Sequence, residues 1–283
     1  TLRVNTAPFP LRTVTYWVVA CVGILALLTD LWQAEEWLVP AGQAISTNQW
    51  QALLGLVFLT TFLMWAWFAF IRPPLYSSWN ARRYAHELYG AILKGSPNEL
   101  AVVADELSKS ASELVRAVPE TRRVLPPGTV PRQTIKLSPV EGYAHDIFLL
   151  IADRRFCRAI VETSPGTALN LFRAVAESKK YRIPIGTFGR NIIAEALEDP
   201  NSFVFHEVEG YETGLIGYQK PISQTIFGDY ALVEAAAELL DQDYRRQRDW
   251  SSEQWEAYCR LTLVSFEGYV ENCFWRPSPV LYR

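Results

Sequence analysis

The sequence ALLGLVFLTTFLMWAWFAFI occupies residues 52–71, and none of its side chains carries a charge. As a helix with a rise of about 1.5 Å per residue, such a segment spans roughly 30 Å, the thickness of the hydrocarbon core of a bilayer. A second uncharged run, residues 13–29, lies shortly upstream. The two runs predict a transmembrane helical hairpin attached to a much larger polar region.

The charges around the two runs predict the orientation of the hairpin. The connection at residues 30–50 carries Asp30, Glu35 and Glu36 but no Lys or Arg, whereas arginines precede the first run and follow the second. Because Lys and Arg concentrate on the cytoplasmic side of membranes, we expect both termini inside and the acidic loop outside. The expected location is the inner cell membrane, which the chain crosses twice.

Two other interpretations of the apolar runs stay open. Residues 18–21, Val-Val-Ala-Cys, resemble the cleavage box of a lipoprotein signal peptide, but most of the apolar core follows Cys21 instead of preceding it. Alternatively, both runs are buried helices of a soluble core. An uncharged run as long as residues 52–71 makes this the less favoured interpretation.

Apolar periodicity and helix breakers predict a mainly α fold, in which the hairpin is followed by a mostly helical cytoplasmic α(+β) domain with at most a small sheet. The expected parts are a cytoplasmic tail 1–14, the hairpin 15–71 with its outer loop 30–50, membrane-proximal helices 72–118, a proline-rich linker 119–137 and a cytoplasmic helical domain 138–283.

Helix-start signals recur in the polar region. Ser96-Pro97-Asn98-Glu99 and Ser138-Pro139-Val140-Glu141 are capping boxes with proline at the first helical position, and Ser251 with Gln254 is a third. We expect helices over residues 77–94, 96–118, 138–161, 164–180, 190–199, 230–246 and 252–273. Alternating side chains predict a strand over residues 202–208, with His206 and Glu207 on opposite faces.

Composition narrows the classes of function. The chain has 27 Lys and Arg against 30 Asp and Glu, so it is close to neutral, which argues against nucleic acid as a partner. The four cysteines are far apart and form no C-x-x-C pair, so neither a metal site nor another cofactor is expected. Reduced, mostly buried thiols fit a cytosolic domain.

Two weak patterns offer chemistry. His145 and Asp153, if they share one helix, lie about two turns apart on one face and can form an acid–base pair, although structural roles are commoner. Gly186-x-x-Gly189-Arg190 precedes a predicted helix and can present N–H groups and a guanidinium to a phosphate; a tight turn is the simpler interpretation. Arg82 and Arg83 lie close enough to the second run to contact anionic lipid headgroups.

Residues 209–230 interleave glycines with aromatic side chains, a composition typical of ordered binding loops. We predict a partner-binding loop here, with the residues Tyr211, Gly214, Gly217, Tyr218 and Lys220. The alternative is a structural loop that covers the core.

The favoured function is a hairpin-anchored cytoplasmic interaction or sensory domain, acting as an oligomer or with a partner protein at the bilayer. The membrane runs hold no ionisable residue away from their ends, so a pore requires an oligomer, lined by Thr60 and Thr61. This channel is one alternative. The other is a membrane-associated enzyme that acts on lipid or nucleotide through His145 and Asp153, although enzymatic activity is the less favoured expectation.

Overall fold

The computed structural model describes residues 11–35, 47–68, 75–120, 138–212 and 221–272, and the regular elements in these ranges are all helices. The prediction of a mainly helical fold is therefore confirmed for the described residues. The chain divides into two compact units, residues 1–75 and residues 76–283, and each is described by itself.

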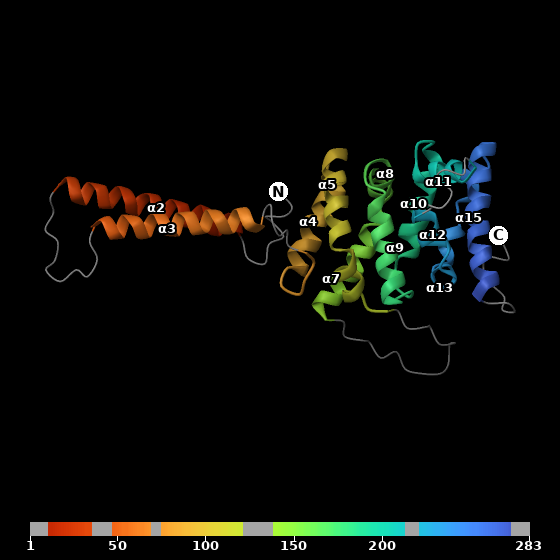
Figure 1. Ribbon diagram of the computed structural model, residues 1–283, viewed down its shortest axis with the longest axis horizontal. Helices are drawn as coiled ribbons and strands as arrows, with labels where there is room; N and C mark the ends of the chain where they lie inside the picture. Colours follow the sequence, from red (N-terminus) through yellow and green to blue (C-terminus); the bar gives the residue numbers. More distant parts are fainter. Residues whose placement is uncertain (1–10, 36–46, 69–74, 121–137, 213–220, 273–283) are drawn as a thin grey trace. The chain divides into compact units, whose positions relative to one another are not determined.

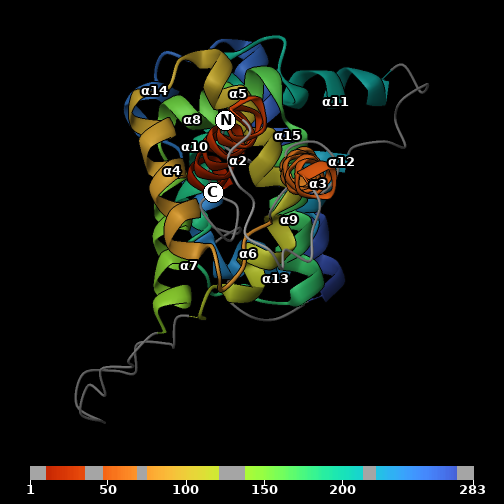
Figure 2. The ribbon, with the colours of Figure 1, turned by 90° about the vertical axis from the view of Figure 1, so that its left-hand side faces the viewer.

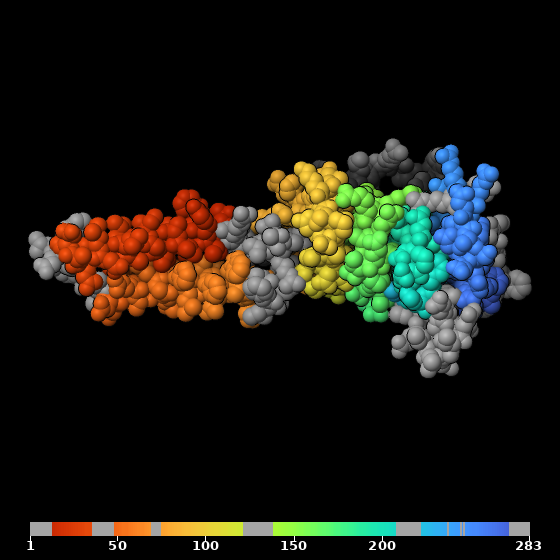
Figure 3. Space-filling model, turned by 90° about the horizontal axis from the view of Figure 1, so that it is seen from above, coloured from red at the N-terminus to blue at the C-terminus, as the bar shows by residue number. Residues whose placement is uncertain are grey.

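The first unit contains two long helices, α2 (Leu11–Ala34) and α3 (Thr47–Ala66), which lie alongside each other (Figures 1 and 2). Both are long and apolar enough to cross a membrane. Their apolar windows, Thr13–Ala34 and Asn48–Ala66, have mean hydropathies of 2.0 and 1.3. None of the first window and 11% of the second is buried, so neither helix is a core helix of the described structure. Figure 3 shows their side chains meeting along the pair.

Helix α2 extends past its uncharged run at both ends, and α3 begins before its run does. Helix α2 continues through Asp30 to Ala34 and α3 begins at Thr47, so the loop predicted over residues 30–50 is shorter than expected. Apolarity marks the expected membrane core but not the residue at which backbone hydrogen bonding stops. Gln51 Nε2 donates to Asp30 Oδ1 over 2.6 Å and links the polar ends of the two helices.

The second unit begins with three helices: α4 (Ala81–Lys94), α5 (Pro97–Lys109) and α6 (Ala111–Ala117). The capping box at the start of α5 is confirmed, because the Glu99 N–H donates to Ser96 Oγ and the Ser96 N–H donates to Glu99 Oε2. A single helix over residues 96–118 is wrong. It breaks at Ser110, whose Oγ accepts a hydrogen bond from the backbone N–H of Tyr76.

Four further helices follow: α7 (Pro139–Leu150), α8 (Arg154–Thr163), α9 (Gly166–Ser178) and α10 (Gly186–Glu198). The capping box of Ser138 and Glu141 is confirmed at the start of α7. The helix predicted over residues 138–161 is wrong, because α7 ends at Leu150 and Asp153 caps a separate helix, α8.

Helices from before and after residues 121–137 share one core. Helix α4 packs on α7, α5 packs on α8 and α9, and α6 packs on α9. Phe172 of α9 stacks on Phe188 of α10 with ring centroids 6.0 Å apart, and both are fully buried. In Figure 1, α4 and α15 lie at opposite sides of this unit, with α8, α9 and α10 between them. The predicted linker lies mostly outside the described residues.

The remaining elements are α11 (Phe203–Glu212), α12 (Pro221–Phe227), α13 (Tyr230–Ala235), the 3₁₀ helix η2 (Ala237–Leu240), α14 (Tyr244–Gln247) and α15 (Ser252–Asn272). The capping pair Ser251 and Gln254 is confirmed by two reciprocal hydrogen bonds. A single helix over residues 230–246 is wrong, because a 3₁₀ helix and an irregular segment separate α13 from α14.

The strand predicted over residues 202–208 is also wrong, since these residues begin α11. Phe203, Val204 and Glu207 are buried, which is a helical and not an alternating pattern. His206 and Glu207 are therefore helix neighbours. The Glu207 carboxylate accepts hydrogen bonds from the N–H groups of Ile222 and Ser223 over 3.0 and 2.9 Å, so it caps the start of α12.

Candidate functional site

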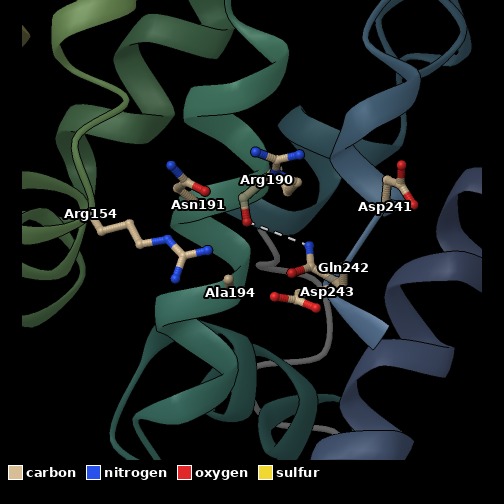
Figure 4. Close-up of a pocket in the computed structure, with 7 residues that line it drawn as sticks. All are labelled: Arg154, Arg190, Asn191, Ala194, Asp241, Gln242 and Asp243. Carbon is tan, nitrogen blue, oxygen red and sulfur yellow. Dashed lines mark hydrogen bonds between the residues drawn. The ribbon is translucent and has the colours of Figure 1, made fainter. Parts of the chain in front are cut away.

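A pocket of about 290 Å³ lies where α8, α10 and the segment after η2 meet (Figure 4). It is lined by Arg154 of α8, by Arg190, Asn191 and Ala194 of α10, and by residues 241–243. All of these side chains except that of Ala194 are polar or charged. We call this site the Arg154 pocket, and its lining suits a polar ligand.

Local capping positions one wall of the Arg154 pocket. Asp153 Oδ1 accepts a hydrogen bond from the Phe156 N–H over 3.1 Å, which makes Arg154 the first residue of α8. Asn191 Nδ2 donates to the carbonyl oxygen of Ala152 over 2.6 Å. This bond ties α10 to the turn between α7 and α8, so the two helices hold a fixed separation at the pocket.

The opposite wall is the segment that follows η2. Gln242 Nε2 donates to the carbonyl oxygens of Arg190 and Leu239 over 3.4 and 3.3 Å. Asp243 Oδ1 accepts a hydrogen bond from the Arg245 N–H over 3.0 Å at the start of α14. In Figure 4, Arg154 enters from one side of the pocket, and Gln242 and Asp243 enter from the other.

Sequence reasoning singled out one residue of this pocket, Arg190, and for a different arrangement. Asn191, Gln242 and Asp243 were missed. Single amides and carboxylates carry no local signal, and the hydrogen bond between Gln242 and Arg190 joins residues 52 positions apart. The cap beside the pocket does have a local signal: Asp153 precedes an amphipathic segment, and an aspartate in that position is a recognisable helix cap.

The pairing predicted for His145 and Asp153 requires one shared helix, and the structure does not provide it. His145 lies in α7, whereas Asp153 is the cap of α8. His145 Nδ1 is 3.9 Å from Asp146 Oδ1, a neighbour on its own helix that is mostly exposed. The premise of the acid–base pair is therefore wrong.

The glycines at the start of α10 lie in its first turn instead of preceding it. Thr187 Oγ1 donates to Glu238 Oε2 over 2.8 Å, so a carboxylate of the chain already lies close to this helix N-terminus. A Cβ atom on Gly189 would lie 2.2 Å from Leu239 Cδ2 and 2.9 Å from Phe172 Cζ. Close packing of α10 explains Gly189 without a phosphate.

Replacing Gly189 with alanine is expected to lower the free energy of unfolding by about 1–3 kcal/mol, because the buried Leu239 and Phe172 have no space to move away. Gly90→Ala is the matched control. Its Cβ would meet no atom within 4 Å, and alanine in a helix is expected to stabilise by about 0.5–1 kcal/mol. Thermal unfolding of both variants tests these opposite signs, and equal shifts would contradict the packing role.

Helix α4 presents an exposed face of basic and amphipathic side chains. Its buried face consists of Ala81, Tyr84, Leu88 and Ile92. Arg82 and Arg83, the residues predicted to contact lipid headgroups, are exposed, and so are Tyr89 and Leu93 on the helix and Trp79 in the turn before it. Aromatic and basic side chains on one face are typical of a helix at a membrane interface.

Helix α15 presents an apolar stripe at helical spacing, formed by the exposed side chains Trp255, Cys259, Leu263, Phe266 and Val270. Exposed acidic residues accompany it: Glu253, Glu256, Glu267 and Glu271. The only basic residue of α15 is Arg260, which pairs with Glu256. We call this surface the α15 stripe.

The remaining predicted site residues are those of the partner-binding loop and the two threonines of the second apolar helix. Tyr211 lies in α11, and Gly214, Gly217, Tyr218 and Lys220 lie outside the described residues. Thr60 is exposed, whereas Thr61 is buried and its hydroxyl donates to the carbonyl oxygen of Val57 in its own helix. This bond satisfies the Thr61 hydroxyl within the helix.

Among the described residues, no group of three or more His, Cys, Asp and Glu is arranged to hold a metal ion. Cys157 is buried, as expected for the thiols, but Cys21 and Cys259 are exposed. Comparison of the chain with protein-family models, curated proteins and solved structures found no match.

Proposed function

We propose that the protein is a membrane-anchored interaction and sensory protein, in which the α2–α3 hairpin holds the second unit at the cytoplasmic surface of the inner membrane. The observation that carries the proposal is the pair of long apolar helices whose side chains are almost entirely uncovered. Exposed apolar surface of this extent is costly in water, and lipid removes the cost.

The exposed face of α4 supports the same arrangement. Residues 67–75 are the chain that separates the end of α3 from the second unit, so α4 starts close to the hairpin in sequence. Each Lys or Arg near an anionic leaflet contributes about 1 kcal/mol to attraction. Arg82 and Arg83 are therefore proposed to contact lipid headgroups, with Trp79 and Tyr89 at the interface.

The α15 stripe supports the interaction role, and its charges favour one kind of partner. Two stripes that pack on each other would bring glutamates together, which opposes a symmetric contact between copies of this chain. A basic amphipathic segment of another protein complements both the apolar side chains and the acidic ones. We propose such a segment as the partner.

The two alternatives find less support. The enzyme alternative relied on a shared helix for His145 and Asp153, which is absent. For a channel, the hairpin offers few polar side chains besides Thr60 to line a pore. A Cβ on Gly23 or Gly55 would meet nothing within 4 Å, so these glycines are not close-packing positions within the hairpin. An oligomer held together by contacts between hairpins would favour the channel alternative.

The mass and composition of the gently solubilised complex test the interaction role. We expect the 32.2 kDa chain to purify with a partner protein, and the double change Leu263→Ser and Phe266→Ser to release that partner. Val102→Ser with Leu149→Ser, at exposed apolar sites of α5 and α7, is the control and should leave the complex intact. A chain that purifies alone, or a complex indifferent to the stripe, would contradict the proposal.

A further inference from the structure

We propose that the Arg154 pocket binds a small polar α-amino acid in its zwitterionic form. The guanidinium groups of Arg154 and Arg190 receive the carboxylate, and the opposite wall, Gln242 and Asp243, receives the ammonium group. This inference names the ligand of the proposed sensory role, and it rests on that proposed function.

The anionic end of the ligand is indicated by the two arginines. Within the described part of the chain, neither the Arg154 nor the Arg190 guanidinium makes a hydrogen bond or an ion pair. Other arginines of this unit do: Arg158, for example, pairs with Glu195 over 2.8 Å. Two guanidinium groups at one pocket are thus available for a carboxylate, which they can bind through charge-assisted hydrogen bonds.

The cationic end is indicated by two buried amides. Asn191 and Gln242 are 6% and 8% exposed, and their NH₂ groups donate to backbone carbonyl oxygens. A carbonyl oxygen only accepts, so this bonding fixes each amide with its nitrogen toward the backbone. The amide oxygens of both residues make no hydrogen bond with described residues, and Figure 4 shows the Gln242 oxygen directed into the pocket. Each oxygen is free to accept a hydrogen bond from an N–H donor of a ligand in the pocket.

Asp243 adds a charge to this acceptor wall. Its Oδ1 accepts the Arg245 N–H, which holds the carboxylate in place and leaves Oδ2 for a cation. An ammonium group carries three donors, so it can satisfy Gln242 Oε1 and the Asp243 carboxylate together. A neutral amide ligand would supply donors without matching the Asp243 charge.

The equal numbers of positive and negative side chains in the pocket favour a zwitterionic ligand over an ion of one charge. The lining holds two arginines and two aspartates, so a free phosphate would meet Asp241 and Asp243, and a simple amine would meet both arginines. A ligand with both charges pairs with each wall. A volume of about 290 Å³ lies at the small end of ligand pockets, and the shortage of apolar lining favours a short polar side chain.

Isothermal titration calorimetry of the full chain in lipid nanodiscs tests the proposal. The probes are L-serine, L-asparagine and L-glutamine, with ethanolamine as the analogue that lacks the carboxylate, glycerate as the one that lacks the ammonium group, and inorganic phosphate. We expect at least one amino acid to bind, with both serine analogues about tenfold or more weaker.

Two variants test the two ends separately. Arg154→Gln is expected to weaken amino-acid binding by about tenfold or more, and Asp243→Asn likewise, since asparagine still accepts the Arg245 N–H and keeps the local fold. Arg173→Gln on α9 and Asp146→Asn on α7 are exposed controls and should bind like the unaltered chain. Thermal unfolding verifies that all four variants fold.

Absence of amino-acid binding, equal binding of the analogues, binding of phosphate in place of amino acids, or binding unaffected by both pocket variants would each overturn the proposal. The anchor is measured independently by membrane fractionation. A chain that fractionates with membranes but binds no amino acid contradicts the pocket alone, and one that binds an amino acid but leaves the membrane contradicts the anchor alone.

Discussion

The double change Ile24→Asp and Leu56→Asp is expected to release the protein from membranes or to prevent its insertion. Both residues lie near the middle of their apolar windows and are 59% and 60% exposed. An aspartate at the centre of a transmembrane helix costs about 2.5–3.5 kcal/mol, so two together shift insertion by roughly a thousandfold or more. The measurement is the share of protein that stays with membranes after alkaline washing.

A control pair at equally exposed sites of the second unit separates the effect of the membrane from the effect of adding charge. Val102→Asp with Leu149→Asp introduces the same charges at sites that are 60% and 55% exposed in the second unit, and it should leave membrane retention unchanged. If α2 and α3 met water, aspartate at an exposed site would be harmless in both pairs. Equal retention of the two double variants would therefore contradict the transmembrane assignment.

Phe172→Ala is expected to lower the free energy of unfolding of the second unit by about 3–5 kcal/mol, through lost burial and the cavity left behind. The ring is fully buried, stacks on Phe188 and lies against the backbone of Gly189, so several helices rely on it. This is a large share of the stability of about 5–15 kcal/mol that is typical of a domain. Urea unfolding followed by circular dichroism measures the change.

A graded series keeps this prediction testable if the alanine variant fails to fold. Phe172→Leu keeps most of the apolar volume and is expected to lose less than the alanine variant. Tyr89→Ala, at an exposed aromatic of α4, should change the free energy of unfolding by about 0.5 kcal/mol or less. Similar losses for the buried and the exposed site would show that Phe172 is not a core residue.

The features that were predictable from sequence are those governed by nearby residues. The capping boxes at Ser96 and Ser138 involve side chains three positions apart, so the chemistry that starts α5 and α7 is local. The two apolar helices were also predictable, because length and hydropathy suffice to identify them. Their ends were not, since α2 continues through the charged Asp30 to Ala34.

The errors arise where tertiary packing decides. Residues 203–208 alternate β-favouring side chains, yet they form a helix that buries Phe203, Val204 and Glu207, and α12 begins on the Glu207 carboxylate. Similarly, one helix was predicted to continue through residues 150–154, where the chain turns and Asp153 caps a new helix. Local periodicity does not record such breaks.

The Arg154 pocket was beyond prediction for a related reason. Its walls come from three segments, and the orientation of Asn191 and Gln242 depends on hydrogen bonds to Ala152 and Leu239 and to the backbone of Arg190. Only the folded chain brings these groups to one pocket. The glycine pattern that drew attention to Arg190 reflects instead the close packing of Gly189 on Leu239.

Cysteine labelling in cells most directly tests a hairpin that crosses the membrane twice and leaves the second unit inside. Cys21, Cys259 and Cys273 are replaced by serine, and Cys157 is kept, because burial raises the pKa of its thiol and keeps it unreactive. Single cysteines are then introduced by Glu36→Cys in the outer connection and by Val102→Cys on α5, and a membrane-impermeant maleimide is added.

We predict that the cysteine at position 36 reacts in intact cells and that the cysteine at position 102 reacts only after the membrane is opened. Reaction of position 102 in intact cells, or no reaction of position 36 until the membrane is opened, would contradict the proposed topology.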